Sequence, residues 1–195
     1  ICGTENLQSN SDPYFHIRSL EQIIAIRNAS GCAVTTATGN TPPVADAGSD
    51  WTIPRGTAFF MTGNASDPDA DALSYCWEQY DLGAASPPTN PYGPLFRSFN
   101  PTSGATRYFP DVSQVLAGSS DPFEVMPSVD RSLTLRLTVR DNAAGGGGVD
   151  DDEVEVTVSG DPFMVTSPNG GESFVAGQPV TVTWDVGGSV GTDVV

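Results

Sequence analysis

The run LTLRLTVR, residues 133–140, alternates apolar and polar side chains without a break. This alternation has the period of a β-strand with one face in a core and the other toward water, whereas a helix would scatter the same residues around its axis. The polar members Thr134, Arg136 and Thr138 are expected to face solvent. The sequence therefore predicts a sheet that is buried on one side.

Shorter runs with the same period lie on both sides of this strand. They are Trp51 with Ile53, Phe59 with Met61, Tyr75 with Trp77, Leu95 with Arg97 and Phe99, and Val154 with Val156 and Val158. The 21 glycines and 16 prolines of the chain provide turns between them. About seven such strands, with a tryptophan on an early central one, predict a mainly β, immunoglobulin-like sandwich over residues 39–160.

The segments on either side of residues 39–160 have different patterns. Within residues 1–38, Ser19 and Gln22 have the spacing of a capping box, and the apolar periodicity that follows predicts a helix over residues 20–28. A second helical candidate lies at residues 112–116. Residues 161–195 contain a strand, a PNGGE turn, a short strand and VTVTW, which predict the start of a further, truncated β-sandwich whose apolar face is left uncovered.

Three cysteines indicate an oxidising compartment if two of them pair. A Cys2–Cys32 disulfide would close a loop of about 30 residues around the predicted helix and stabilise it by roughly 3–4 kcal/mol. Cys76 lies in a predicted strand and is expected to be a buried, inert thiol.

The charge of the chain excludes several kinds of partner. There are 24 acidic residues against eight basic ones, all arginines, for a net charge of −16. Nucleic acids and anionic membranes require clustered positive charge, so neither is an expected partner. No apolar run approaches the roughly 20 residues of a membrane helix. We expect a secreted, extracellular monomer.

The chain lacks the motifs of the common catalytic sites. Zinc catalysis needs three or four ligands at fixed spacing, and the single histidine, His16, is expected to serve packing or hydrogen bonding instead. Nucleophile-elbow, P-loop and dinucleotide glycine patterns are also missing. An active site within these residues is therefore not expected.

One acidic stretch, SDPDADALSYCWEQYD at residues 66–81, has the chemistry of a metal site. Asp67, Asp69 and Asp71 alternate, so in an extended turn their carboxylates can converge on Ca²⁺, a hard cation that takes six to eight oxygen ligands. Asp46 and Asp141 are expected nearby, where their backbone carbonyls would complete the shell. The alternative is a solvated Asp-Pro turn. The pattern is not that of an EF-hand.

A second acidic group, at residues 150–153, follows four glycines. Runs of like charge of this kind are usually solvated. We therefore expect this group to lie in a solvated loop.

Residues 41–81, beginning TPPVADAGSDW and continuing through SDPDADALSYCW, together with RLTVRDN at residues 136–142, resemble PKD-type and cadherin-like bacterial domains. The resemblance implies an immunoglobulin-like fold. Ala70 stands where these domains usually have glycine, which stiffens the turn.

The first residues, ICGTENLQSNSDPYFHIRSLEQI, resemble the segment after the methionine turn of bacterial reprolysin-like metallopeptidases of the metzincin clan. The segments YCWEQYD, FRSFNP and VRDNAAGGGGVD add to this likeness, and PNGGESFVAG with VTVTWDV is similar to the next sandwich domain of such proteases. The resemblance implies that the zinc site and its Zn²⁺ lie upstream of Ile1, so no catalytic residue is carried over.

These likenesses predict the non-catalytic C-terminal region of a secreted zinc metallopeptidase. It would comprise a catalytic-domain tail (1–38), a Ca²⁺-stabilised sandwich that binds a protein substrate or a surface or matrix component (39–160), and the start of another sandwich (161–195). The alternative is an adhesion module without protease ancestry. Exposure of Tyr92, Phe96 or Tyr108 in one patch would indicate a binding face, whereas a structural spacer would have no ligand for the long loops.

Overall fold

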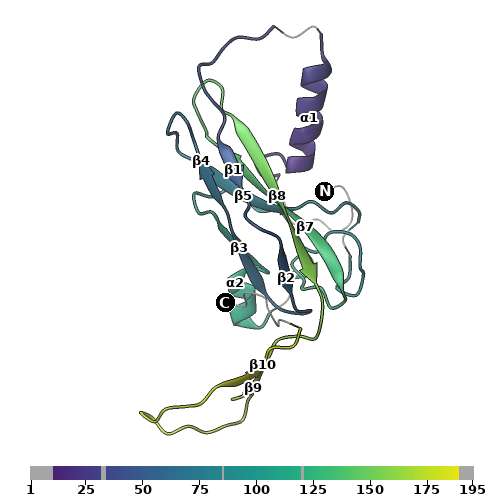
Figure 1. Cartoon of the computed structure of the whole chain (residues 1–195), viewed down its shortest axis with the longest axis vertical. Coiled ribbons are helices and arrows are strands. Elements are labelled where there is room, and N and C mark those ends of the chain that lie inside the picture. Colours follow the sequence, from purple (N-terminus) through teal and green to yellow (C-terminus); the bar gives the residue numbers. More distant parts are fainter. Residues whose placement is uncertain (1–10, 32–33, 85, 120, 189–195) are drawn as a thin grey trace.

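The computed structural model describes residues 11–31, 34–84, 86–119 and 121–188 and has a mainly β fold, as expected (Figure 1). Two helices accompany the strands: α1 (Ile17–Ala29) and α2 (Val112–Ala117). The strands are β1 (Val44–Asp46), β2 (Trp51–Ile53), β3 (Phe59–Thr62), β4 (Asn64–Ser66), β5 (Ser74–Gln79), β6 (Thr106–Phe109), β7 (Arg131–Arg140), β8 (Val149–Val158), β9 (Met164–Ser167) and β10 (Thr183–Asp185). We call residues 44–158 the central β region.

The largest sheet has four strands in the order β2-β8-β7-β5. β7 pairs antiparallel with β5 and β8, and β2 pairs parallel with β8. The register places Leu137 opposite Trp77 on one side and Asp152 on the other. Two shorter antiparallel pairs, β3–β6 and β1–β4, lie in the same region.

The apolar core lies between the four-stranded sheet and the β3–β6 pair. Phe59 and Phe109, opposite each other in that pair, stack with ring centroids 5.0 Å apart. Trp77 crosses the core and donates its indole N–H to Ala105 O at 2.9 Å. A Cβ atom on Gly63 would lie 2.2 Å from Leu137 Cδ2, so the two layers meet here with no room for a side chain.

Three expectations about these strands were wrong. Leu95–Phe99 forms only an isolated bridge at Phe96, because the Gln79 side-chain oxygen accepts the N–H groups of Leu95 and Phe96 in place of a neighbouring strand. Trp77 lies on β5, which is the last strand of its sheet and not a central one. Thr138 is fully buried, although it lies on the face predicted to meet water.

The acidic residues 150–153 were also misassigned, since they belong to β8. The carboxylate of Asp150 accepts the N–H of Ala45 at 2.9 Å, and that of Asp152 accepts the N–H of Ala47 at 2.8 Å. These two side chains attach β1 and the residue after it to β8, in place of a ladder of backbone hydrogen bonds. Inward-pointing charges of this kind also protect the edge of a sheet from unwanted pairing.

Both predicted helices are present. α1 begins earlier than expected, with His16 as its N-cap in place of Ser19, and His16 Nδ1 accepts the N–H of Arg18 at 3.2 Å. α2 is capped by Asp111 and ends at Gly118, whose φ of 59° is in the left-handed region. Within the described ranges, neither helix has the length and apolar character needed to cross a bilayer.

The C-terminal segment forms fewer strands than expected. Of the predicted strands, β9 and β10 pair antiparallel, and the described residues between them include no third strand. All residues of both strands are exposed, and the pair extends away from the central β region (Figure 1). Its apolar side chains therefore remain uncovered.

Of the three cysteines, only Cys76 lies in the described part of the chain. It is buried with a free thiol, as expected, and burial raises its pKa to about 12, with the charge of Glu78 adding to the effect. The predicted Cys2–Cys32 disulfide falls outside the described residues.

Candidate metal centre

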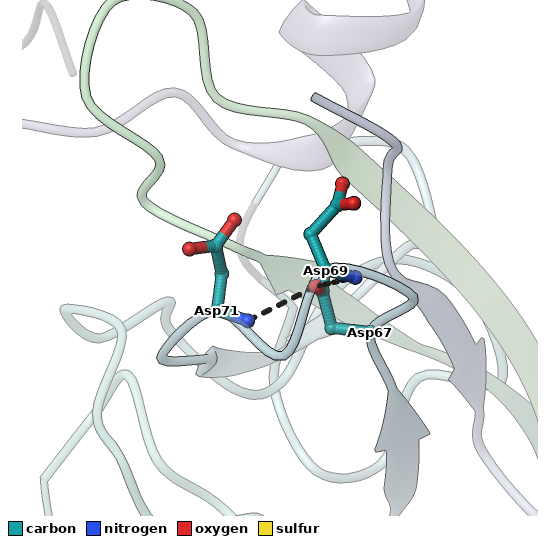
Figure 2. A group of neighbouring side chains, drawn as sticks. All are labelled: Asp67, Asp69 and Asp71. Carbon is teal, nitrogen blue, oxygen red and sulfur yellow. Dashed lines mark hydrogen bonds between the residues drawn. The ribbon is translucent and has the colours of Figure 1, made fainter. Parts of the chain in front are cut away.

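The turn between β4 and β5 brings the three alternating aspartates together. Asp67 Oδ1 accepts two backbone N–H groups, that of Asp69 at 2.9 Å and that of Asp71 at 3.0 Å. Aspartate side chains stabilise turns in this way by replacing a backbone acceptor. The chain therefore curls around the Asp67 side chain, and the carboxyl groups of Asp69 and Asp71 rise on the same side of the turn (Figure 2).

One carboxylate oxygen from each of Asp67, Asp69 and Asp71 lies within 4.8 Å of the others. Partial burial raises the pKa of Asp71, and the charges of Asp67, Asp141 and Asp69 raise it further. The second oxygen, Asp67 Oδ2, is buried and has no hydrogen-bond partner. A buried acceptor without a partner beside two repelling carboxylates is the chemistry that a divalent cation satisfies.

The segment that enters β1 also reaches this turn. Thr41 donates its backbone N–H to Asp69 Oδ2 at 2.6 Å. Asn40, the residue before it, donates its side-chain amide to Asp141 Oδ2 at 2.7 Å. Neither residue was among the predicted site residues, although a polar Asn-Thr pair directly before two prolines was the available signal.

Asp141 lies near the turn, as expected, but its carboxylate is engaged elsewhere. It is almost fully buried and accepts the N–H groups of Ala143 and Gly148 in addition to the Asn40 amide. Burial raises its pKa, but these hydrogen bonds outweigh that effect and hold the pKa below its ordinary value. A Cβ on Gly148 would lie 2.8 Å from Asp141 Oδ2 and 2.6 Å from Pro42 Cα, so this position has no room for a side chain.

Asp46 lies farther from the turn than predicted. The antiparallel register places Val44 opposite Ser66 but Asp46 opposite Asn64, two residue pairs from the turn, or about 7 Å along the strand. Its carboxylate accepts the N–H of Gly48 at 3.0 Å. The described residues therefore bring the carboxylates of Asp67, Asp69 and Asp71 into one cluster, without that of Asp46 or Asp141. A ligand role for their backbone carbonyls stays a prediction.

Ala70, at the tip of the turn, adopts a left-handed conformation with φ of 61°. A Cβ atom in this region costs roughly 1–2 kcal/mol, and glycine avoids that cost. The turn thus keeps the conformation that glycine would favour, and the strain is small enough for the hydrogen bonds to Asp67 to hold it.

This cluster presents three acidic oxygen donors without nitrogen or sulfur donors among the residues that form it. Such a set suits Ca²⁺, which binds carboxylates, carbonyls and water in flexible geometry, and does not suit Zn²⁺. In comparisons with known proteins, no family model, curated protein or solved structure matches this chain.

Proposed function

We propose that the central β region is a calcium-stabilised, immunoglobulin-like accessory domain of the PKD type. The observation that carries this proposal is the convergence of Asp67, Asp69 and Asp71 beside the unpartnered oxygen of Asp67. Calcium would neutralise their mutual repulsion. Because Asp69 also accepts the N–H of Thr41, binding would act on the segment that leads into β1 as well as on the turn.

Such a domain stabilises and positions rather than catalyses. In the larger protein that the sequence resembles, it would hold the upstream zinc peptidase domain against a protein substrate or a surface component outside the cell. The purified chain should not hydrolyse peptides, with or without added Zn²⁺. A zinc-dependent peptidase activity that copurifies with the chain would contradict this assignment.

Thermal unfolding tests the calcium site. The chain should melt at a higher temperature with Ca²⁺ than with a chelator, because a ligand at about 100 times its Kd stabilises the folded state by about 2.7 kcal/mol. Asp69→Asn should abolish the difference. Asp130→Asn is the matched control, since it removes an exposed carboxylate whose ion pair with Arg55 is long, at 3.5 Å. If the wild-type chain has the same melting temperature with Ca²⁺ and with a chelator, the aspartates form a solvated turn.

An adhesion module is the second candidate, favoured by exposed aromatic residues. Phe60 and Tyr108 lie opposite each other on the outer side of the β3–β6 pair, with ring centroids 5.6 Å apart, and both are exposed. Tyr92 is 77% exposed, but Phe96 is buried and cannot join such a patch. The upstream sequence separates the candidates: HExxHxxGxxH supports the protease, and further sandwich repeats support adhesion.

A further inference from the structure

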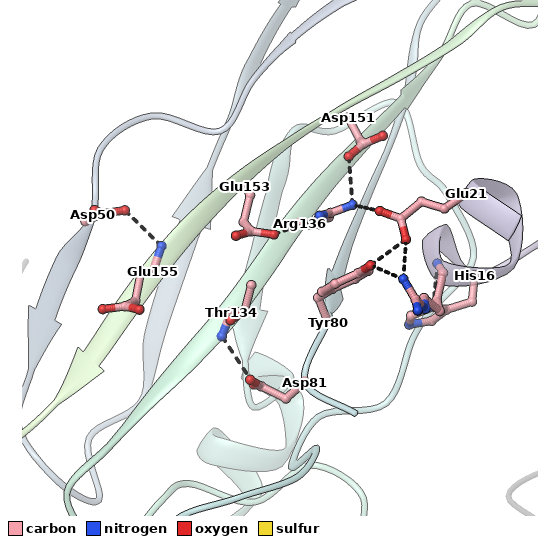
Figure 3. Close-up of polar contacts among 11 residues, drawn as sticks. His16, Glu21, Asp50, Tyr80, Asp81, Thr134, Arg136, Asp151, Glu153 and Glu155 are labelled. Carbon is pink, nitrogen blue, oxygen red and sulfur yellow. Dashed lines mark hydrogen bonds and ion pairs between the residues drawn. The ribbon is translucent and has the colours of Figure 1, made fainter. Parts of the chain in front are cut away.

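The helix α1 is attached to the four-stranded sheet mainly through charged side chains around Arg136 (Figure 3). Arg136 Nη1 pairs with Glu21 of the helix and lies 3.2 Å from Asp151 Oδ2, and Arg136 Nε donates to Glu153 at 2.9 Å. The guanidinium group stacks 3.9 Å above the centre of the Tyr80 ring, and the Tyr80 hydroxyl donates to Glu21. Glu21 is therefore the main contact of the helix with the sheet.

Arg18, one turn before Glu21, extends this network. Its Nη1 lies 2.9 Å from Glu21 Oε2 and donates to the Tyr80 hydroxyl at 2.7 Å. The side chains of both Arg18 and Glu21 remain partly open to solvent. Salt weakens ion pairs that solvent can reach, so the hold on this part of the helix depends on ionic strength.

The start of α1 is held by a buried carboxylate. Glu78 of β5 is 0% exposed, and its Oε2 accepts the N–H of Ile17 at 2.8 Å. Its other oxygen accepts the hydroxyl of Ser98 and lies 3.7 Å from His16 Nε2. Docking therefore removes water from an acidic group and replaces it with a few hydrogen bonds, an exchange in which desolvation offsets much of the gain.

Apolar burial contributes little to the attachment. Ile17 is the one residue of α1 that is buried, whereas Ile23 is exposed and Ile26 is 72% exposed. The helix is exposed from Ala25 to its end, and so are residues 34–39 of the segment that leads back to β1. Leu20 and Ile24 are only half-buried, so hydrophobic contact, which holds most helices to a core, is limited beyond Ile17.

We propose that α1 is a detachable strap, which leaves and rejoins the outer face of the sheet as a unit while the central β region stays folded. The ion pairs of Glu21 set the balance between the docked and undocked states. Undocking uncovers Arg136, Tyr80 and Glu78. The strap depends neither on the calcium site nor on the protease ancestry proposed above.

Hydrogen exchange of the whole chain, followed by mass spectrometry, tests the strap. An undocked helix of 13 residues melts readily in water, so exchange of its amides reports undocking. The measurement compares α1 with β7 at about 0.1 M and about 1 M NaCl, between which the Debye length falls from about 10 Å to about 3 Å. Glu21→Gln removes the central charge, and Arg27→Gln removes a charge from the exposed last turn.

We expect α1 to exchange faster than β7 in every sample. High salt and Glu21→Gln should each accelerate exchange in α1 by about fivefold or more, whereas Arg27→Gln should not, and β7 should stay unchanged throughout. Exchange of α1 and β7 at one common rate would overturn the proposal, because the helix would then open only with the whole fold. If neither high salt nor Glu21→Gln changes the exchange rate of the α1 amides, the proposal is overturned as well.

Discussion

On the inner face of β7, Leu133, Leu135 and Leu137 are fully buried against apolar side chains, whereas on the outer face Arg136 lies beneath α1 among carboxylates and a tyrosine ring. Both faces of one strand are thus covered, but only one is covered by hydrophobic packing. Burial of apolar surface contributes about 25 cal/mol per Å², while partly exposed ion pairs contribute little each. Coverage of both faces therefore does not mean equal stabilisation, and the two faces should respond differently to substitution.

Leu137→Ala should have the largest effect. It leaves a cavity between β5 and the β3–β6 pair and should lower the free energy of unfolding by about 2–5 kcal/mol, measured by urea denaturation. Ser132→Ala, an exposed position on the same strand, is the control and should change it by less than about 0.5 kcal/mol. A cost for Leu137→Ala no larger than that of the control would mean that the inner face is not the core.

A pH-dependent effect is expected from a buried ion pair on the core side. Glu124 and Arg107 lie 2.8 Å apart, and Arg107 stacks against Phe99 and Phe109. Burial raises the pKa of Glu124 from 4.5 to about 7, although Arg107 and the N–H of Asp111 counteract it. The folded state therefore binds the proton more tightly than the unfolded state, and stability from this group falls as pH rises from about 4.5 to about 7.

Glu124→Gln should remove this dependence. The difference in unfolding free energy between wild type and variant should change by on the order of 2 kcal/mol between pH 4.5 and 7.5, with the wild type losing stability relative to the variant as pH rises. Parallel pH profiles would show that Glu124 titrates as it does in the unfolded chain.

Thr138→Val should raise stability by about 1 kcal/mol. Thr138 Oγ1 is buried without a hydrogen-bond partner in the described structure, and valine has nearly the same shape without the polar group. Thr134→Val, at a partly exposed position on the same face, should be nearly neutral. A loss of stability in Thr138→Val would indicate that the hydroxyl has a partner, such as a buried water.

The smallest effect is expected outside both faces, in the aspartate turn. Ala70→Gly removes the steric cost of a left-handed alanine but increases the conformational entropy of the unfolded chain. The free energy of unfolding, measured by urea titration, should rise by a net amount of about 0.5 kcal/mol. Ala72→Gly, two residues later in the exposed part of the turn, lacks the positive φ and should lose stability. If both variants lose stability equally, the left-handed conformation at Ala70 is not present in solution.

Alternation along the chain predicted the inner face of β7 well, because a period of two depends only on neighbouring residues. The packing of α1 on the outer face could not be predicted in this way, because Glu21 and Arg136 are 115 residues apart and the sequence does not show that they pair. Gln79 likewise accepts the N–H groups of Leu95 and Phe96, so the alternation along residues 95–99 predicts a strand that does not form.

The aspartate turn shows the same division between local and distant contacts. Asp67, Asp69 and Asp71 converge as their spacing predicts, because a single turn brings them together. Asn40 and Thr41 reach this neighbourhood through the fold, and Asp46 is placed away from it by the register of β1 and β4. Strand register depends on packing across the whole region, which spacing in the sequence does not encode.

Calorimetric titration of the chain with Ca²⁺ tests the central claim most directly. We predict binding of one Ca²⁺ per chain, lost in Asp69→Asn and retained in Asp130→Asn, with much weaker binding of Mg²⁺ because that ion demands a stricter octahedral site. Absence of a binding heat across a range of temperatures, or equal binding by wild type and Asp69→Asn, would contradict a calcium centre at this turn.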